Sequence, residues 1–228
     1  MPRSTLTISG ETPGRSRIEE LLAGEALLAF EDCDFSGADL SRLNLQETGF
    51  RNCALLETSF YAANLSRTRW QRCRAGHADF ESADLVDARF ESCDLNNSSW
   101  RRAKLASSSF RSCKLTGALF EDVSYLGLSF EDCLLIGADL RRMSFRKLTL
   151  VGLDFADADL SGCDFRDAVF EGGGLREAHI KDTRFEGADL READLGGVRL
   201  VNAKLFAGAT ISPRQAAEIV RALGLNVA

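Results

Sequence analysis

Seven cysteines are the residues best suited to chemistry, and six of them recur at intervals of twenty residues: Cys33, Cys53, Cys73, Cys93, Cys113 and Cys133. Thiolates bind zinc or act as nucleophiles when further cysteines or histidines converge on them. The chain has no CxxC motif and only two histidines, His77 and His179. We therefore predict no metal site, no cofactor and no catalytic residue, and free cysteines with a structural role.

The interval of twenty contains four units of a shorter repeat. A large apolar residue stands at every fifth position from Phe30 to Leu205, with Ala75 as the exception. Two positions before it lies a small residue, usually Ala, Cys, Ser or Thr. A period of five fits neither a helix nor a strand. A short fixed period over this length indicates a solenoid, whose units bury their apolar faces against their neighbours.

One coil of this solenoid then has four sides. Aromatic residues such as Phe50, Trp70 and Phe90 fall on one side, and aliphatic residues such as Leu55 and Leu95 fall on the next. Such a continuous rod predicts no cleft in which catalytic groups converge, so we do not expect an enzyme.

Four units resemble the A(D/N)LXX pentapeptide repeat: Ala38–Arg42, Ala83–Asp87, Ala138–Arg142 and Ala188–Glu192. The resemblance implies an all-β fold, the right-handed quadrilateral β-helix, here with about nine coils. We expect this β-helix over residues 29–208, and the unbroken repeat leaves no room for loops that project from the coils.

The two ends depart from the repeat. Residues 1–28 are expected to form an N-terminal arm and cap, flexible up to about Gly14 and helical over residues 16–28. Residues 209–228 are expected to form a C-terminal helix and tail, because Ser212 and Gln215 have the spacing of a capping box. The apolar side chains of this segment predict a dimer interface, formed by Ile219, Val220, Leu223, Leu225 and Val227.

Charge is distributed unevenly along the chain. The stretch from Val151 to Leu195 has twelve acids and five bases, a net charge of −7. This acidic balance opposes direct binding of nucleic acid. Either these acids only solvate the surface, or they form an acidic, partner-binding face. For the second interpretation the candidates are Asp154, Asp157, Asp164, Asp167, Glu171, Glu177, Asp182, Glu186 and Glu192.

Three segments resemble the Qnr and MfpA-type proteins: Cys33–Ser41, Cys73–Phe80 and Gln215–Val227. In that family the C-terminal segments join two copies into a DNA-like dimer. The dimer binds DNA gyrase or topoisomerase IV and protects it from drugs. The resemblance therefore implies a non-enzymatic, homodimeric, DNA-mimicking protein that confers quinolone resistance or self-resistance on an antibiotic producer.

The alternative function is a protein-binding scaffold with a partner other than a topoisomerase. A basic middle patch would serve it, formed by Arg101, Arg102, Lys104, Arg111 and Lys114. Leu56, Leu126, Ile136 and Phe206 occupy positions that the repeat directs outward. No segment is apolar enough to span a membrane, and the N-terminal residues show no signal-peptide pattern, so a cytoplasmic location is expected.

Overall fold

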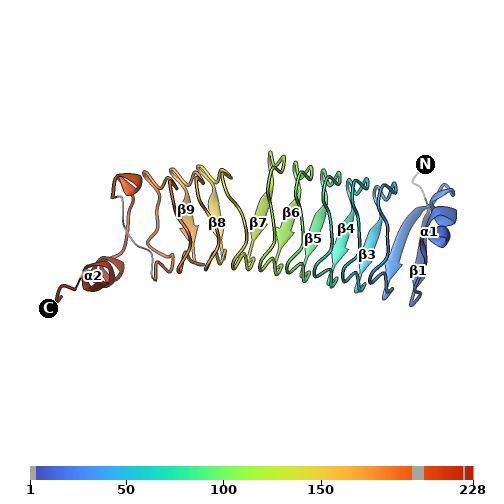
Figure 1. Ribbon diagram of the computed structural model, residues 1–228, viewed down its shortest axis with the longest axis horizontal. Coiled ribbons are helices and arrows are strands. Elements are labelled where there is room, and N and C mark those ends of the chain that lie inside the picture. The colour runs from blue at the N-terminus through green and yellow to red at the C-terminus, as the bar shows by residue number, and fades with distance from the viewer. Residues whose placement is uncertain (1–3, 197–202, 223, 228) are drawn as a thin grey trace. The chain divides into compact units, whose positions relative to one another are not determined.

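A computed structural model describes residues 4–196, 203–222 and 224–227, arranged in two compact units, Met1–Asp139 and Leu140–Ala228. The N-terminal unit contains a parallel sheet whose strands follow one another in chain order, as Figure 1 shows. Its elements are β1 (Thr5–Ser9), α1 (Arg15–Leu22), β2 (Leu27–Glu31), β3 (Gly49–Arg51), β4 (Arg69–Gln71), β5 (Arg89–Glu91), β6 (Ser109–Arg111) and β7 (Ser129–Glu131).

The strands from β2 onward form the first side of a four-sided coil. Phe50 lies opposite Phe30 and Trp70, each twenty residues away. Isolated parallel bridges with the same spacing form the second, third and fourth sides, for example Asp34 to Ala54, Asp39 to Ser59 and Asn44 to Asn64. The predicted quadrilateral β-helix is therefore confirmed.

The C-terminal unit is built from the same kind of coil. It contains β8 (Thr149–Val151), β9 (Val169–Glu171), η1 (Ala203–Phe206) and α2 (Pro213–Ala222). Its other sides are formed by bridges from Asp154 to Gly174, Asp159 to His179 and Asp164 to Arg184. The described residues supply one first-side strand per coil from β2 to β9, which gives about eight coils where the sequence predicts about nine. Within this described part, none of the helices has the length and apolar character of a membrane span.

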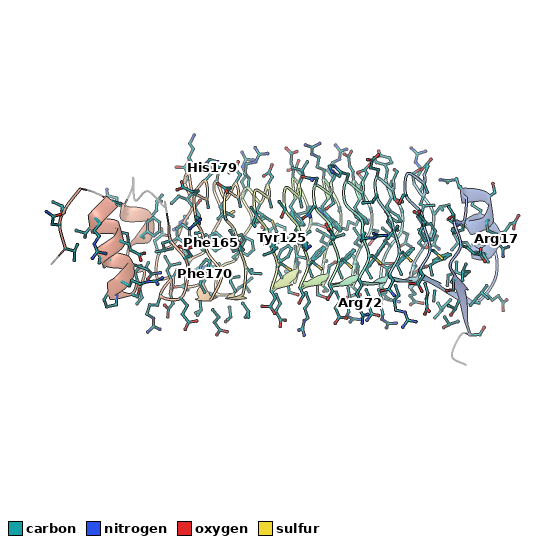
Figure 2. All side chains as sticks on the ribbon, turned by 90° about the horizontal axis from the view of Figure 1, so that it is seen from below. Arg17, Arg72, Tyr125, Phe165, Phe170 and His179 are labelled. Carbon is teal, nitrogen blue, oxygen red and sulfur yellow. The ribbon has the colours of Figure 1, made fainter. Side chains whose placement is uncertain are left out.

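The interior explains the five-residue repeat. Rings from successive coils stack, as Phe50, Trp70 and Phe90 do with centroids 4.1 and 5.3 Å apart. The small residue two positions earlier can also satisfy a polar group of the ring that follows it. Trp70 Nε1 donates a hydrogen bond to Thr68 Oγ1 at 2.8 Å. In the C-terminal unit Phe165 and Phe170 point into the coil while His179 points outward (Figure 2).

All seven cysteines are buried and free, as predicted. Six of them form one column, in which Cys53 Sγ donates to the Phe30 carbonyl at 3.4 Å. A hydrogen bond with Cys73, together with burial, raises the pKa of Cys53. The Cys53 thiol therefore stays neutral and packs as a small apolar side chain.

The Asp of the repeat closes the corner of the coil. Asp34 Oδ1 accepts a hydrogen bond from the Ser36 backbone N–H at 2.9 Å, and Asp159 Oδ1 accepts one from Ser161 at 3.0 Å. This side-chain mimic of a turn satisfies a backbone donor that the coil leaves unpaired. An acid at this position therefore stabilises the turn, and its presence alone does not indicate a binding site.

The prediction of a flexible arm is wrong for residues Thr5–Ser9, which form a strand. Strand β1 pairs in parallel with β2, and Ile8 is buried opposite Phe30. The alternation of Leu6 and Ile8 with threonine and serine is a strand pattern that the interpretation as an arm overlooked. Helix α1 is also shorter than the expected 16–28, because Leu27 already belongs to β2, and it covers the first coil with the buried Ile18.

The last coil contains one extra residue. Asp189 pairs with Thr210, twenty-one residues away, and the ring of Phe206 stacks on Phe185 with centroids 4.8 Å apart. The prediction that the register runs unbroken to Leu205, with Phe206 outward, is therefore wrong at its end. The shift lies between Leu195 and Phe206, and part of that segment falls outside the described residues.

Candidate partner-binding surface

The nine candidate acids lie on the first, second and fourth sides and at the corners between sides, so they do not share one face. Asp154 is on the second side, Asp164 and Glu186 are on the fourth, and Glu171 ends β9 on the first. The other five occupy corners: Asp157, Asp167, Glu177, Asp182 and Glu192. The reason is the repeat itself, since only residues separated by multiples of twenty share a column.

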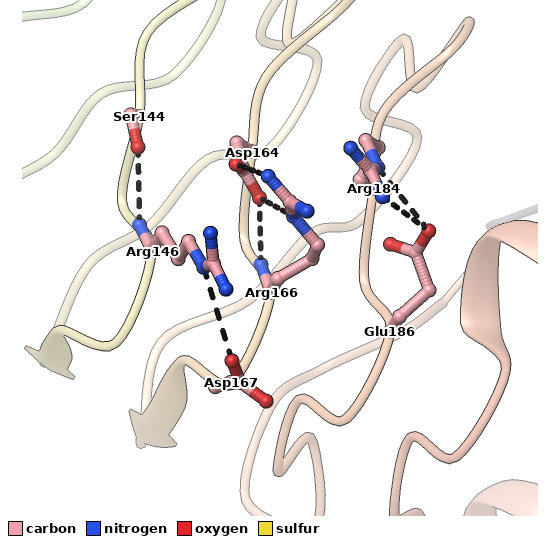
Figure 3. A network of polar contacts seen from close by, with 7 residues as sticks. All are labelled: Ser144, Arg146, Asp164, Arg166, Asp167, Arg184 and Glu186. Atoms are coloured by element: carbon pink, nitrogen blue, oxygen red, sulfur yellow. Dashed lines mark hydrogen bonds and ion pairs between the residues drawn. The ribbon is translucent and has the colours of Figure 1, made fainter.

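Arginines neutralise the acids of the fourth side (Figure 3). Asp164 binds Arg166 through two hydrogen bonds of 2.8 and 2.6 Å, and Glu186 binds Arg184 at 3.1 Å. The hydrogen bond from Arg166 lowers the pKa of the Asp164 carboxyl. The two residues that flank an inward residue point to the same face of the coil. The sequence therefore indicates this pairing by the motifs Asp-x-Arg and Arg-x-Glu, which a count of charges does not detect.

Asp167, at the adjoining corner, is also neutralised. Its carboxylate lies 3.9 Å from Nε of Arg146, whose backbone N–H donates to Ser144 Oγ (Figure 3). The fourth side of the C-terminal unit therefore carries three acids and three arginines in close contact, and its net charge is near zero.

The corner between the second and third sides differs. Asp157 and Glu177 lie one coil apart there, both exposed, and neither forms an ion pair with another described residue. The nearby acids Asp159 and Asp194 are paired with arginines at 3.7 and 3.8 Å. Asp157 and Glu177 therefore form the strongest uncompensated negative charge among the candidates in one column. We call them the acidic corner.

The basic middle patch is largely neutralised. Arg101, Arg102, Lys104 and Arg111 each bind an acid about one coil away, at 3.3 Å for Glu121 and 3.4 Å for Asp84. The five residues are also spread over the four sides, so they do not form one patch. This geometry removes one observation behind the scaffold alternative, whereas the outward position of Leu56 and Leu126 is confirmed, with 46% and 87% of their surface exposed.

The C-terminal helix begins as predicted. The Gln215 backbone N–H donates to Ser212 Oγ at 3.3 Å, and Gln215 Oε1 accepts from the Ser212 backbone N–H at 2.6 Å, which completes the capping box. The sequence missed a second role of Gln215, which is buried. Its Nε2 donates to the carbonyls of Leu190 and Ala193, both at 2.7 Å, so α2 caps the carbonyls of the preceding coil.

The candidate dimer residues lie on and after this helix. Ile219 and Val220 are half-buried, while Leu225 and Val227 are exposed. Leu223 lies outside the described residues. Their part in a dimer interface stays a prediction.

The surface has two hollows in the described part of the N-terminal unit. A hollow of about 680 Å³ lies beside α1 and β2, lined by Leu22, Glu25, Leu27 and Thr48 among others. A groove of about 520 Å³ follows the next coils and is lined by Leu27, Glu47, Arg67, Arg69, Asp87 and Arg89.

Comparison with known families agrees with this geometry. The family model "Pentapeptide repeat region" matches residues 43–120, and "Pentapeptide repeats (8 copies)" matches residues 29–55, 133–172 and 175–205. The chain is therefore a pentapeptide-repeat protein with a β-solenoid scaffold.

Among solved structures the chain is similar to QnrB1, a plasmid-mediated fluoroquinolone resistance protein. Full-length QnrB1 superimposes with a TM-score of 0.52 and 22% identity, over 98% of this chain and 99% of QnrB1. A trypsin-treated variant of QnrB1 gives 0.54 and 21%, over 99% and 98%. At this identity the likeness establishes the fold. No curated protein sequence matches the chain.

Proposed function

We propose that this protein binds DNA gyrase or topoisomerase IV without catalysis and protects it from an antibiotic that targets the enzyme. The observation that carries the proposal is the end-to-end match to QnrB1, which a bare repeat does not require. The match covers nearly the whole of both chains, and so includes the strand and helix at the N-terminus and the helix at the C-terminus. The two segments that depart from the repeat thus have counterparts in a resistance protein.

The acidic corner is the part of the surface that we assign to the enzyme. A DNA-binding channel is basic, and a protein that occupies it needs carboxylates that are not already bound to arginine. Asp157 and Glu177 meet this requirement, whereas Asp164, Asp167 and Glu186 do not. Of the other candidates, Asp154 lies on the adjoining second side, whereas Glu171, Asp182 and Glu192 lie on another side or at other corners, so the proposal places only Asp154 beside this contact.

The active form in this proposal is a homodimer joined through α2 and the tail. Leu225 is 59% exposed and Val227 is 38% exposed, which leaves apolar surface for a second copy. Removing residues 223–228 is expected to halve the mass in light scattering. An unchanged mass would contradict this arrangement and leave the rest of the proposal to be judged by enzyme assays.

The direct test of the proposal is a pull-down with the separate gyrase subunits, followed by DNA supercoiling with a fluoroquinolone and increasing amounts of the protein. We expect retention of gyrase and recovery of supercoiled DNA. If gyrase and topoisomerase IV both fail to bind, and neither is protected at any ratio, the proposal is wrong. A cell location is not needed for this test, although the proposal implies the cytoplasm.

A further inference from the structure

Two unpaired arginines among the described residues of the N-terminal unit lie in one column. Arg69 in β4 and Arg89 in β5 lie directly opposite each other on neighbouring strands. Like charges in this arrangement destabilise a sheet. The residues before and after them in the same column are Gly49 and Ser109, so the column supplies no carboxylate.

Several other basic residues of this unit form ion pairs with acids of a neighbouring coil. Arg51 binds Glu31, Arg111 binds Glu131 and Lys104 binds Asp84, in each case one coil away. Within the residues that the structure describes, Arg69 and Arg89 form no ion pair. Arg42, Arg72, Arg74 and Lys114 form none either, but among the described residues of the unit Arg69 and Arg89 are the two unpaired bases that lie opposite each other in one column.

Both arginines line the groove of about 520 Å³, together with Arg67, Glu47 and Asp87. The two acids do not neutralise the pair, because Arg67 lies between them and takes both, at 3.1 Å from Glu47 and 4.0 Å from Asp87. With three arginines and two acids in its lining, the groove keeps a net positive charge, and Arg69 and Arg89 are its unpaired bases.

We infer that Arg69 and Arg89 bind the phosphate group of a small molecule. Neighbouring strands lie about 4.8 Å apart, which allows both guanidinium groups to donate to the oxygens of one phosphate. Arginine presents a planar set of donors that matches phosphate geometry. The groove is larger than a phosphate ion, and Leu27 in its wall provides an apolar contact for the organic part of a phosphate ester.

Calorimetric titration of the full chain at constant ionic strength tests the site, with ADP and inorganic phosphate as separate probes. We expect saturable one-to-one binding of ADP, at least tenfold weaker in Arg69→Gln and in Arg89→Gln. Binding of ADP alone identifies a site for a phosphate ester, and equal binding of both probes identifies a site for the phosphate group itself.

Arg111→Gln is the matched control, because it removes the same charge from the same side but from an ion pair with Glu131. It is expected to bind ADP like the wild type. Equal weakening in all three variants, or no saturation with either probe, would overturn the inference.

The melting temperature without ligand is a second readout. Removing one of two opposed like charges is expected to leave it unchanged or to raise it, and ADP is expected to raise it further only in the wild type and in Arg111→Gln. A lower melting temperature of both Arg69→Gln and Arg89→Gln would show that the pair serves the fold instead, and would contradict the site.

Discussion

The two units fill the inward positions of their coils differently. From Cys53 to Ala118 every residue two positions before a large core residue is Cys, Ala, Ser or Thr, and aromatic rings stack continuously above and below. In the C-terminal unit three consecutive positions of this kind hold Met143, Leu148 and Leu153, whereas in the N-terminal unit large residues are confined to its two ends, as with Leu43, Val123 and Leu128. A large side chain at this position adds volume to a close-packed interior, which the coil must accommodate.

The C-terminal unit accommodates this volume in two ways. Leu148 is 44% exposed and thus turned partly to solvent. Leu153 is buried, and the next coil approaches its backbone so closely at Gly173 that an added Cβ would lie 2.0 Å from the Leu153 carbonyl oxygen. The comparison teaches that the small position admits a large residue when the side chain turns outward, as at Leu148, or when the next coil contributes a glycine, as at Leu153.

Gly173→Ala is expected to have the largest effect. A Cβ at Gly173 would lie 2.0 Å from the Leu153 carbonyl oxygen, and the residue has φ +70°. Strain and overpacking together are expected to lower the free energy of unfolding by about 2–6 kcal/mol in urea denaturation. Gly172→Ala is the control, because Gly172 has φ +77° with no neighbour within 4 Å of the added Cβ. Equal losses in both variants would mean that Leu153 is not the constraint.

In the N-terminal unit, Trp100→Ala is expected to cost about 3–5 kcal/mol of unfolding free energy. The ring of Trp100 is buried and stacks between Phe80 and Phe120, with centroids 4.2 and 5.9 Å away. Trp100→Phe keeps a stacking ring and is expected to lose less. If the two variants melt alike in circular dichroism, stacking is not what holds these coils together.

At the end of the C-terminal unit, Gln215→Ala removes the capping box and leaves two carbonyls without their donor. We expect a loss of about 1–3 kcal/mol, seen as earlier thermal unfolding. Glu218→Ala on the same helix, with an exposed side chain, serves as the control. A loss for Glu218→Ala as large as that for Gln215→Ala would show that helix propensity, not the capped carbonyls, is being measured.

The smallest expected effect concerns the ion pairs, which join different coils in the N-terminal unit and often lie within one coil in the C-terminal unit. The pKa of Asp164 is lowered by Arg166, so its stabilisation is present above its unfolded pKa of about 4 and is lost as the pH falls through the lower folded pKa. Asp164→Asn should therefore be less stable than the wild type at pH 7, by at most about 1 kcal/mol of unfolding free energy. The difference should shrink as the pH falls through the lowered pKa of Asp164. A gap that is independent of pH would rule out the carboxylate charge as its source.

The sequence predicted the fold well because the period of five assigns each side chain a direction. It placed the buried rings, the cysteine column and the capping box at Ser212 and Gln215 correctly. It missed β1, since two apolar residues in a short segment are a weak pattern, and it missed the shifted last coil, since one inserted residue leaves Leu205 in apparent register. The acids were predicted from their number alone, and only side-chain geometry separates Asp157 and Glu177 from those bound to arginine.

One assay tests the central claim most directly, which is that uncompensated carboxylates at the acidic corner contact the topoisomerase. Gyrase supercoiling under a fluoroquinolone is compared for the wild type, for Asp157→Asn/Glu177→Gln and for Asp167→Asn/Glu186→Gln, which changes charge equally at acids paired with arginine. We predict that the wild type and the second variant restore supercoiling and that the first does not. Restoration by the acidic-corner variant at wild-type concentrations would contradict the account.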